Sequence, residues 1–238
     1  MAHAAWKWLF VAVGVGAGVL ACSGDEDDGR DDPPGSGRNE VRPGLGDDPG
    51  EPQGTPFTLP PGVTVSGTVY GADDLSSECL TGVRGRVPDN GSGEYVQVCV
   101  PLRNSTGAPV QVVFPPGLVI VSATETFQHG LLVERVVVTV PPTGNGPGGP
   151  PDGGVDPEAE AVPLFTYCLN ESKSPNERGT PYALGPVTND AALQDLLGLL
   201  AGKRIDDEDE AEVVQDAIYS ITEGEGLTSA DRDALADL

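Results

Sequence analysis

The sequence predicts an α+β fold, an antiparallel β-sandwich followed by a small C-terminal helical subdomain. In the middle of the chain, short runs of β-branched and aromatic residues alternate apolar with polar side chains, and Gly- and Pro-rich turn signals separate them. From residue 189 onward the apolar residues recur at helical spacing instead. Strands followed by helices are typical of an α+β domain.

Six stretches have the composition of strands. Residues 95–102 show the pattern most clearly, because every second residue from Val96 to Leu102 is apolar, which places these side chains on one face. The expected strands cover residues 64–70, 95–102, 110–114, 118–124, 131–140 and 162–169. Several short strands with turn signals between them favour a sandwich.

Three helices are expected after the strands. Asn189 can cap the first, and Asp and Glu in the first turn of the second are favoured by the helix dipole. The expected helices cover residues 190–200, 208–220 and 228–238.

Gly and Pro divide the chain into segments. Residues 23–62 hold 17 Gly or Pro among 40 residues, and residues 141–157 hold 12 among 17. Such composition does not build a packed core. We therefore expect a disordered acidic tether over 22–62 and a single domain over 63–238. Within this domain, 63–170 would form the sandwich, with a flexible loop at 141–161, and 171–238 would be mainly helical.

The net charge of −24 excludes a nucleic-acid-binding protein, which needs a basic surface. The charge is concentrated in two places, with −7 over residues 23–56 and −11 over residues 190–238. Solubility and self-repulsion are the ordinary consequences of such acidic segments. No apolar run approaches the roughly eighteen residues that a spanning helix needs.

The N-terminus has the pattern of a signal peptide. Lys7 precedes a run of thirteen apolar residues, WLFVAVGVGAGVL, which ends at Val19-Leu20-Ala21-Cys22. These last four residues resemble the lipobox of bacterial lipoproteins, although Leu at the second position before the Cys is less usual. The resemblance implies removal of residues 1–21 and lipidation of Cys22, with acyl chains that hold the protein on a membrane. The alternative is an ordinary secretory signal with a chance Cys.

The residues after Cys22 indicate where in the cell the protein would be held. Ser23 and the acidic run that follows resemble the sorting and surface-export signals of some bacterial lipoproteins. This resemblance implies a lipid-anchored protein of the bacterial cell envelope, at the outer membrane or cell surface rather than the inner membrane.

Three cysteines remain if Cys22 is lipidated. An oxidising compartment favours pairing, and an odd number leaves one Cys over. Cys79 and Cys99 enclose a turn-rich interval of 20 residues and form the favoured disulfide. The alternatives pair Cys168 with one of them. In the favoured arrangement, Cys168 is a free thiol in a secreted protein.

Two segments share a pattern that explains a free thiol. They are Phe165-Thr-Tyr-Cys-Leu-Asn170 and Val214-Gln-Asp-Ala-Ile-Tyr219, and together they resemble the signature of bacterial surface thioester domains. The resemblance implies an internal thioester between Cys168 and Gln215, shielded by Tyr167 and Tyr219, which a partner nucleophile opens. The interval of 47 residues is short for that family, Tyr219 replaces the usual Trp, and Val214 stands where Thr is common. The alternative is a core Cys beneath an amphipathic helix whose Gln is incidental.

These patterns predict a lipid-anchored binding or adhesion module with an unidentified protein or surface ligand. The alternative is a structural envelope lipoprotein without covalent chemistry. We expect no enzyme, no cofactor and no metal site, because His129 is the lone His outside the signal and neither a triad nor a zinc site can be assembled around it. A His beside Gly at a turn is typical of a polar surface.

Overall fold

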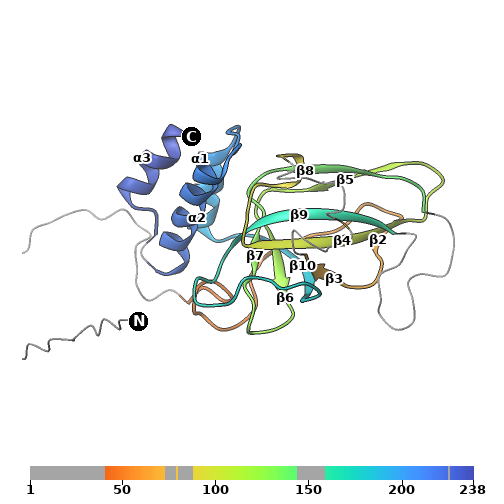
Figure 1. The fold of residues 1–238 in the computed structure, drawn as a ribbon, viewed down its shortest axis with the longest axis horizontal. Coiled ribbons are helices and arrows are strands. Elements are labelled where there is room, and N and C mark those ends of the chain that lie inside the picture. The colour runs from red at the N-terminus through yellow and green to blue at the C-terminus, as the bar shows by residue number, and fades with distance from the viewer. Residues whose placement is uncertain (1–40, 73–78, 80–87, 144–158, 225) are drawn as a thin grey trace, which may run out of the picture. The chain divides into compact units, whose positions relative to one another are not determined.

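A closed antiparallel barrel of six strands forms the centre of the domain (Figure 1). The computed structural model describes residues 41–238 apart from 73–78, 80–87, 144–158 and 225. The strands are β1 (Gly54–Pro56), β2 (Val63–Val65), β3 (Val69–Gly71), β4 (Val96–Asn104), β5 (Val110–Phe114), β6 (Leu118–Ser122), β7 (Gly130–Leu131), β8 (Val136–Val140), β9 (Glu160–Cys168) and β10 (Pro181–Thr188). The barrel strands pair in the order β10-β3-β4-β9-β7-β6, and β6 pairs again with β10. The prediction of a β-sandwich with a helical subdomain is therefore wrong.

Strand β10 closes the barrel, and its sequence explains why the prediction missed it. Pro181, Gly185 and Pro186 are residues that strands normally avoid. Here the register of β10 on β6 shifts between Leu184 and Val187, so Gly185 and Pro186 fall in an irregularity of the ladder. A Cβ at Gly185 would lie 2.5 Å from Val121 Cγ2. Glycine thus permits the close approach that joins the two ends of the sheet.

The barrel interior is filled with aliphatic side chains. The alternation predicted along β4 is confirmed, since the apolar residues from Val96 to Leu102 are fully buried in this core. Tyr182 of β10 contributes a large side chain from the closing strand. A second sheet, β5 paired with β8, buries Val112, Phe114, Val136 and Val140 in the same core. The segment predicted as one strand over 131–140 is two strands, β7 and β8, with a break between them.

Three helices pack at one end of the barrel strands rather than forming a separate subdomain (Figure 1). They are α1 (Ala191–Leu200), α2 (Glu208–Thr222) and α3 (Ser229–Asp237). Asp190, not Asn189, caps α1, because its carboxylate accepts the N–H groups of Ala192 and Leu193. Asp207 caps α2, and Thr228 with Asp231 forms a capping box at α3.

A second core joins the helices to the barrel. It contains outward-facing residues of β6, β7 and β9, such as Val119, Leu131 and Tyr167, packed against the apolar stripes of α1 and α2. Leu45 also belongs to this core and is 5% exposed. The chain therefore packs on the domain well before residue 63, and β1 pairs with β10. The predicted domain boundary at residue 62 lies inside folded chain.

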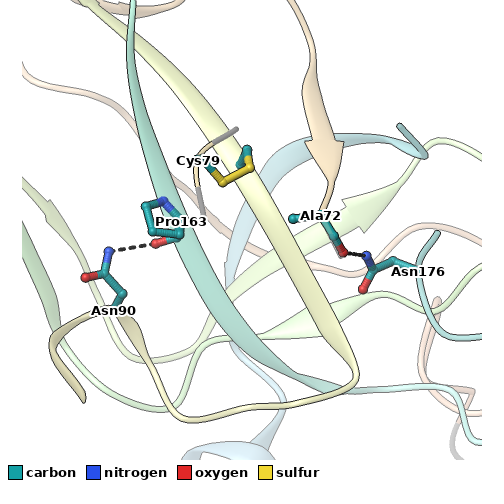
Figure 2. The surroundings of a disulfide bond; sticks show 6 residues. Ala72, Cys79, Asn90, Pro163 and Asn176 are labelled. Carbon is teal, nitrogen blue, oxygen red and sulfur yellow. Dashed lines mark hydrogen bonds between the residues drawn. A yellow bond between two sulfur atoms is a disulfide. The ribbon is translucent and has the colours of Figure 1, made fainter. Parts of the chain in front are cut away.

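The predicted disulfide between Cys79 and Cys99 is confirmed, with Cα atoms 6.0 Å apart (Figure 2). Cys99 lies on β4 and points away from the barrel interior, into a small cluster with Ala72 and Phe165. Asn90 donates to Pro163 O on β9, and Asn176 donates to Ala72 O, each at 2.7 Å (Figure 2). These bonds hold the chain segments on both sides of the disulfide to the outer face of the barrel.

Candidate functional site

Cys168 and Gln215 meet where β9 ends against α2. Strand β4 begins at Val96, opposite Thr166, so it does not extend alongside Cys168. The N–H of Leu169 donates to His129 O on the opposite side of β9. Because successive residues of a strand direct their backbone groups to opposite sides, the N–H and C=O of Cys168 point to the side where β4 would otherwise continue. Gln215 takes that place.

The side-chain amide of Gln215 pairs with the backbone of Cys168 as a peptide group of a neighbouring strand would. The Cys168 N–H donates to Gln215 Oε1 at 2.8 Å, and Gln215 Nε2 donates to Cys168 O at 2.9 Å. Cys168 is fully buried and Gln215 is 3% exposed. The two residues of the predicted pair, which are 47 residues apart in the chain, are thus in direct hydrogen-bond contact and are both buried.

The sulfur of Cys168 sits between two hydrogen-bond donors. The N–H of Asn170 lies 3.2 Å from Cys168 Sγ, and the hydroxyl of Tyr219 bonds to the same sulfur. Burial nevertheless raises the pKa of the Cys168 thiol to about 11, because removal of water disfavours the thiolate more than the two donors favour it. At neutral pH the side chain is therefore a protonated thiol.

The two aromatics predicted as shields both border the pair. Tyr167 is 1% exposed, packs in the core between barrel and helices, and has its hydroxyl 2.7 Å from Ser92 Oγ. Ser92 in turn donates to Glu134. Tyr219 is half-buried on α2, one turn beyond Gln215. The structure therefore brings Cys168, Gln215, Tyr167 and Tyr219 into one place.

A pocket of about 180 Å³ opens beside Gln215. Gln215 forms part of its wall, and its other lining residues are Glu94, Tyr95, Tyr167, Glu208, Asp209, Ala211 and Glu212. Four of these eight residues are acidic, and none is basic. The pocket that borders Gln215 is therefore strongly acidic.

Asn170 links the thiol to the rest of the domain and was not predicted as a site residue. Its Oδ1 accepts the N–H of His129 at 2.9 Å, and its Nδ2 donates to Gly44 O and Gly46 O at 3.0 and 2.9 Å. It is fully buried. The available signal was a polar residue directly after an apolar strand, which needs partners when it is buried.

His129 is not a polar surface residue, contrary to the expectation from its turn sequence. It is 5% exposed, and its Nδ1 accepts the N–H of Ser122 at 3.0 Å. Burial, helped by the nearby charge of Lys173, lowers the pKa of His129 to about 4, so the ring is neutral. Its ring therefore satisfies the backbone N–H of the last residue of β6.

Other expectations concern chain outside the described residues. Cys22 and the signal segment lie there, as does most of the loop predicted over 141–161. Among the residues that the structure describes, no group of three or more His, Cys, Asp or Glu side chains is placed to bind a metal ion. No helix in the same residues has the length and apolarity to cross a membrane.

Comparisons of the chain with protein-family models, with curated proteins and with solved structures found no match.

Proposed function

We propose that this chain is a lipid-anchored protein of the bacterial cell envelope, exposed at the outer membrane or cell surface, that binds a partner covalently through a Cys168–Gln215 thioester. One observation carries the covalent part of the proposal: two hydrogen bonds hold the Gln215 carboxamide against Cys168, and both residues are buried. The lipid anchor rests on the lipobox resemblance at Cys22. A buried, oriented pair favours reaction between its members and protects the product from hydrolysis.

The proposal requires attack of the sulfur on the carboxamide. Cys168 Sγ would bond to Gln215 Cδ, the Cδ–Nε2 bond would break, and Nε2 would leave as ammonia with the thiol proton. The N–H of Cys168 already donates to Oε1, the atom on which negative charge develops during this attack. A partner nucleophile would then attack Cδ and break the C–S bond. Its proton would return to the sulfur, and Gln215 would remain linked to the partner.

The pocket favours an amine as that nucleophile. Its carboxylates, Glu94, Glu208, Asp209 and Glu212, attract a protonated amine and can take up a proton as the amine attacks. An anionic partner would be repelled by the same residues.

Methylamine tests the proposal in the full chain purified in detergent. The expected result is addition of methylamine at Gln215, mapped by peptide mass spectrometry, together with release of one thiol at Cys168. Cys168→Ala is the matched control and should take up no methylamine. If wild-type Gln215 stays unmodified under conditions that open known thioesters, the thioester proposal fails.

A second candidate is a structural envelope lipoprotein with no covalent chemistry. The same two hydrogen bonds favour it, since they satisfy the backbone N–H and C=O of Cys168 where β4 is missing. On that account Gln215 completes the sheet edge and Cys168 is a core residue. Unreactive Gln215 combined with an unmodified chain mass is the outcome that supports it.

A further inference from the structure

Residues 42–48 contact the end of the strand that carries Cys168, and we call them the clasp. Gly46 N–H donates to Leu169 O at 2.9 Å, and Asn170 Nδ2 holds the carbonyl groups of Gly44 and Gly46. Asn170 also gives its N–H to Cys168 Sγ. Asn170 therefore binds the clasp through its side chain and contacts the Cys168 sulfur through its backbone N–H.

The clasp also contacts the end of the helix that carries Gln215. The guanidinium of Arg42 donates to Ile221 O on α2, and it binds both carboxylate oxygens of Asp190 at 2.8 and 2.6 Å. Gly46 lies so close to Thr222 O that a Cβ at this position would overlap it. The clasp thus fastens the end of β9 to the end of α2, the two elements whose side chains form the Cys168–Gln215 pair.

Like charges meet at one end of the clasp. Three carboxylates from separate segments gather there: Asp47 in the clasp, Glu171 after β9 and Glu223 after α2. Burial, together with the charges of Asp47 and Glu171, raises the pKa of Glu223, as expected where like charges oppose one another. Ser172 donates to Asp47 at 2.5 Å from an exposed position. Such a segment can detach by local opening without unfolding of the barrel.

From these contacts we propose that undocking of the clasp controls access to the sulfur of Cys168. With the clasp docked, the sulfur of Cys168 is buried between β9 and α2. With the clasp detached, Asn170 loses two of its partners, and the end of α2 loses its link to β9. The inference rests on the proposed function for its biological meaning. The gating itself concerns access to Cys168 whether or not a thioester forms.

Gly46→Ala is the variant that tests the clasp, because its Cβ would collide with Thr222 O while the barrel and helix contacts stay intact. The measurement is the rate at which iodoacetamide alkylates Cys168 in the folded full chain, mapped by peptide mass spectrometry. Both proteins are first treated with methylamine, which leaves Cys168 as a free thiol in either case. We expect alkylation to be faster in Gly46→Ala by about tenfold or more. Arg42→Ala, which removes the other attachment, should act in the same direction.

The matched control is Gly202→Ala. Gly202 also has a positive φ, 83° against 55° at Gly46, but open space surrounds it. It therefore carries the same kind of backbone strain without touching the clasp, and its alkylation rate should equal that of the wild type. An unchanged rate in both clasp variants would overturn the proposal. So would a rise that matches only the fraction of globally unfolded protein, measured by urea titration. Missing methylamine on Gln215 would instead count against the thioester alone.

Discussion

At the scale of single residues, Gln215 stabilises the fold through its contacts with the backbone of Cys168. Its side-chain amide satisfies the N–H and C=O of Cys168, two backbone groups that are buried and lack a strand partner within the described residues. An unpaired buried backbone group costs about 1–3 kcal/mol. The pair therefore has a stabilising role even before any reaction.

That role can be measured in a Cys168→Ala background, where no thioester can form. Adding Gln215→Ala to this background should lower the free energy of unfolding by about 2 kcal/mol or more, since two groups lose their partners. Gln194→Ala is the control, because exposed Gln194 gives a single hydrogen bond to Thr188 O. If urea titration finds that both Gln variants lose the same free energy of unfolding, Gln215 does not satisfy the backbone N–H and C=O of Cys168.

His129 gives the domain a pH dependence. Its pKa falls from an ordinary 6.5 to about 4 on folding, so the folded state prefers the neutral ring. This contribution is fully present above pH 6.5 and is lost as the pH falls toward 4, by up to about 3 kcal/mol. Chemical denaturation from pH 7 to pH 4 should show this loss in the wild type and a smaller one in His129→Gln. Identical pH profiles would contradict the assignment.

The roles of some residues could be predicted from the type and number of residues alone. The disulfide followed from an odd cysteine number and a turn-rich interval, and it is present. The burial of His129 could not be foreseen, because it depends on the N–H of Ser122 across a turn. Asn170 was missed for a similar reason: its partners Gly44 and Gly46 lie more than 120 residues away in the chain.

At the scale of elements, local sequence patterns predicted individual strands and helices but not the closure of the sheet into a barrel. The alternation along β4 and the helical stripes of α1 and α2 match the structure because each element buries one face. The difference between a sandwich and a barrel lies in β10, whose Pro and Gly residues mask a strand. Pairing of a single strand with both β3 and β6 is a tertiary property that periodicity does not encode.

Closure of the barrel at β10 makes a prediction for Gly185. Gly185→Ala would push a methyl group against Val121 Cγ2 and Val119 O, 2.5 and 2.8 Å away, and should destabilise the domain by about 1–3 kcal/mol. Gly198→Ala on α1 is the control, since nothing lies within 4 Å of its Cβ position and helix propensity favours Ala. Thermal unfolding should show a lower midpoint for the first variant and an equal or higher one for the second. An unchanged midpoint for Gly185→Ala would argue against the tight β10–β6 seam.

At the scale of the whole molecule, the segments that looked separable by composition are connected. The acidic stretch predicted as a free tether over 22–62 contains the clasp, which binds the end of β9 and the start of α1 through Asn170 and Asp190. Burial alone would raise the pKa of Asp190, but Arg42 and the N–H groups of Leu193 and Ala192 outweigh it and lower the pKa, so the carboxylate keeps its charge for this connection.

The Cys168–Gln215 thioester can be tested directly by the mass of the full chain after rapid denaturation in acid. Wild type and Cys168→Ala carry the same N-terminal modification, so their difference isolates the site. After correction for the substituted side chain, the thioester account predicts a wild-type chain lighter by one ammonia. A wild-type mass that differs from the variant by the side chain alone would contradict it, and would leave Gln215 as a purely structural partner of Cys168.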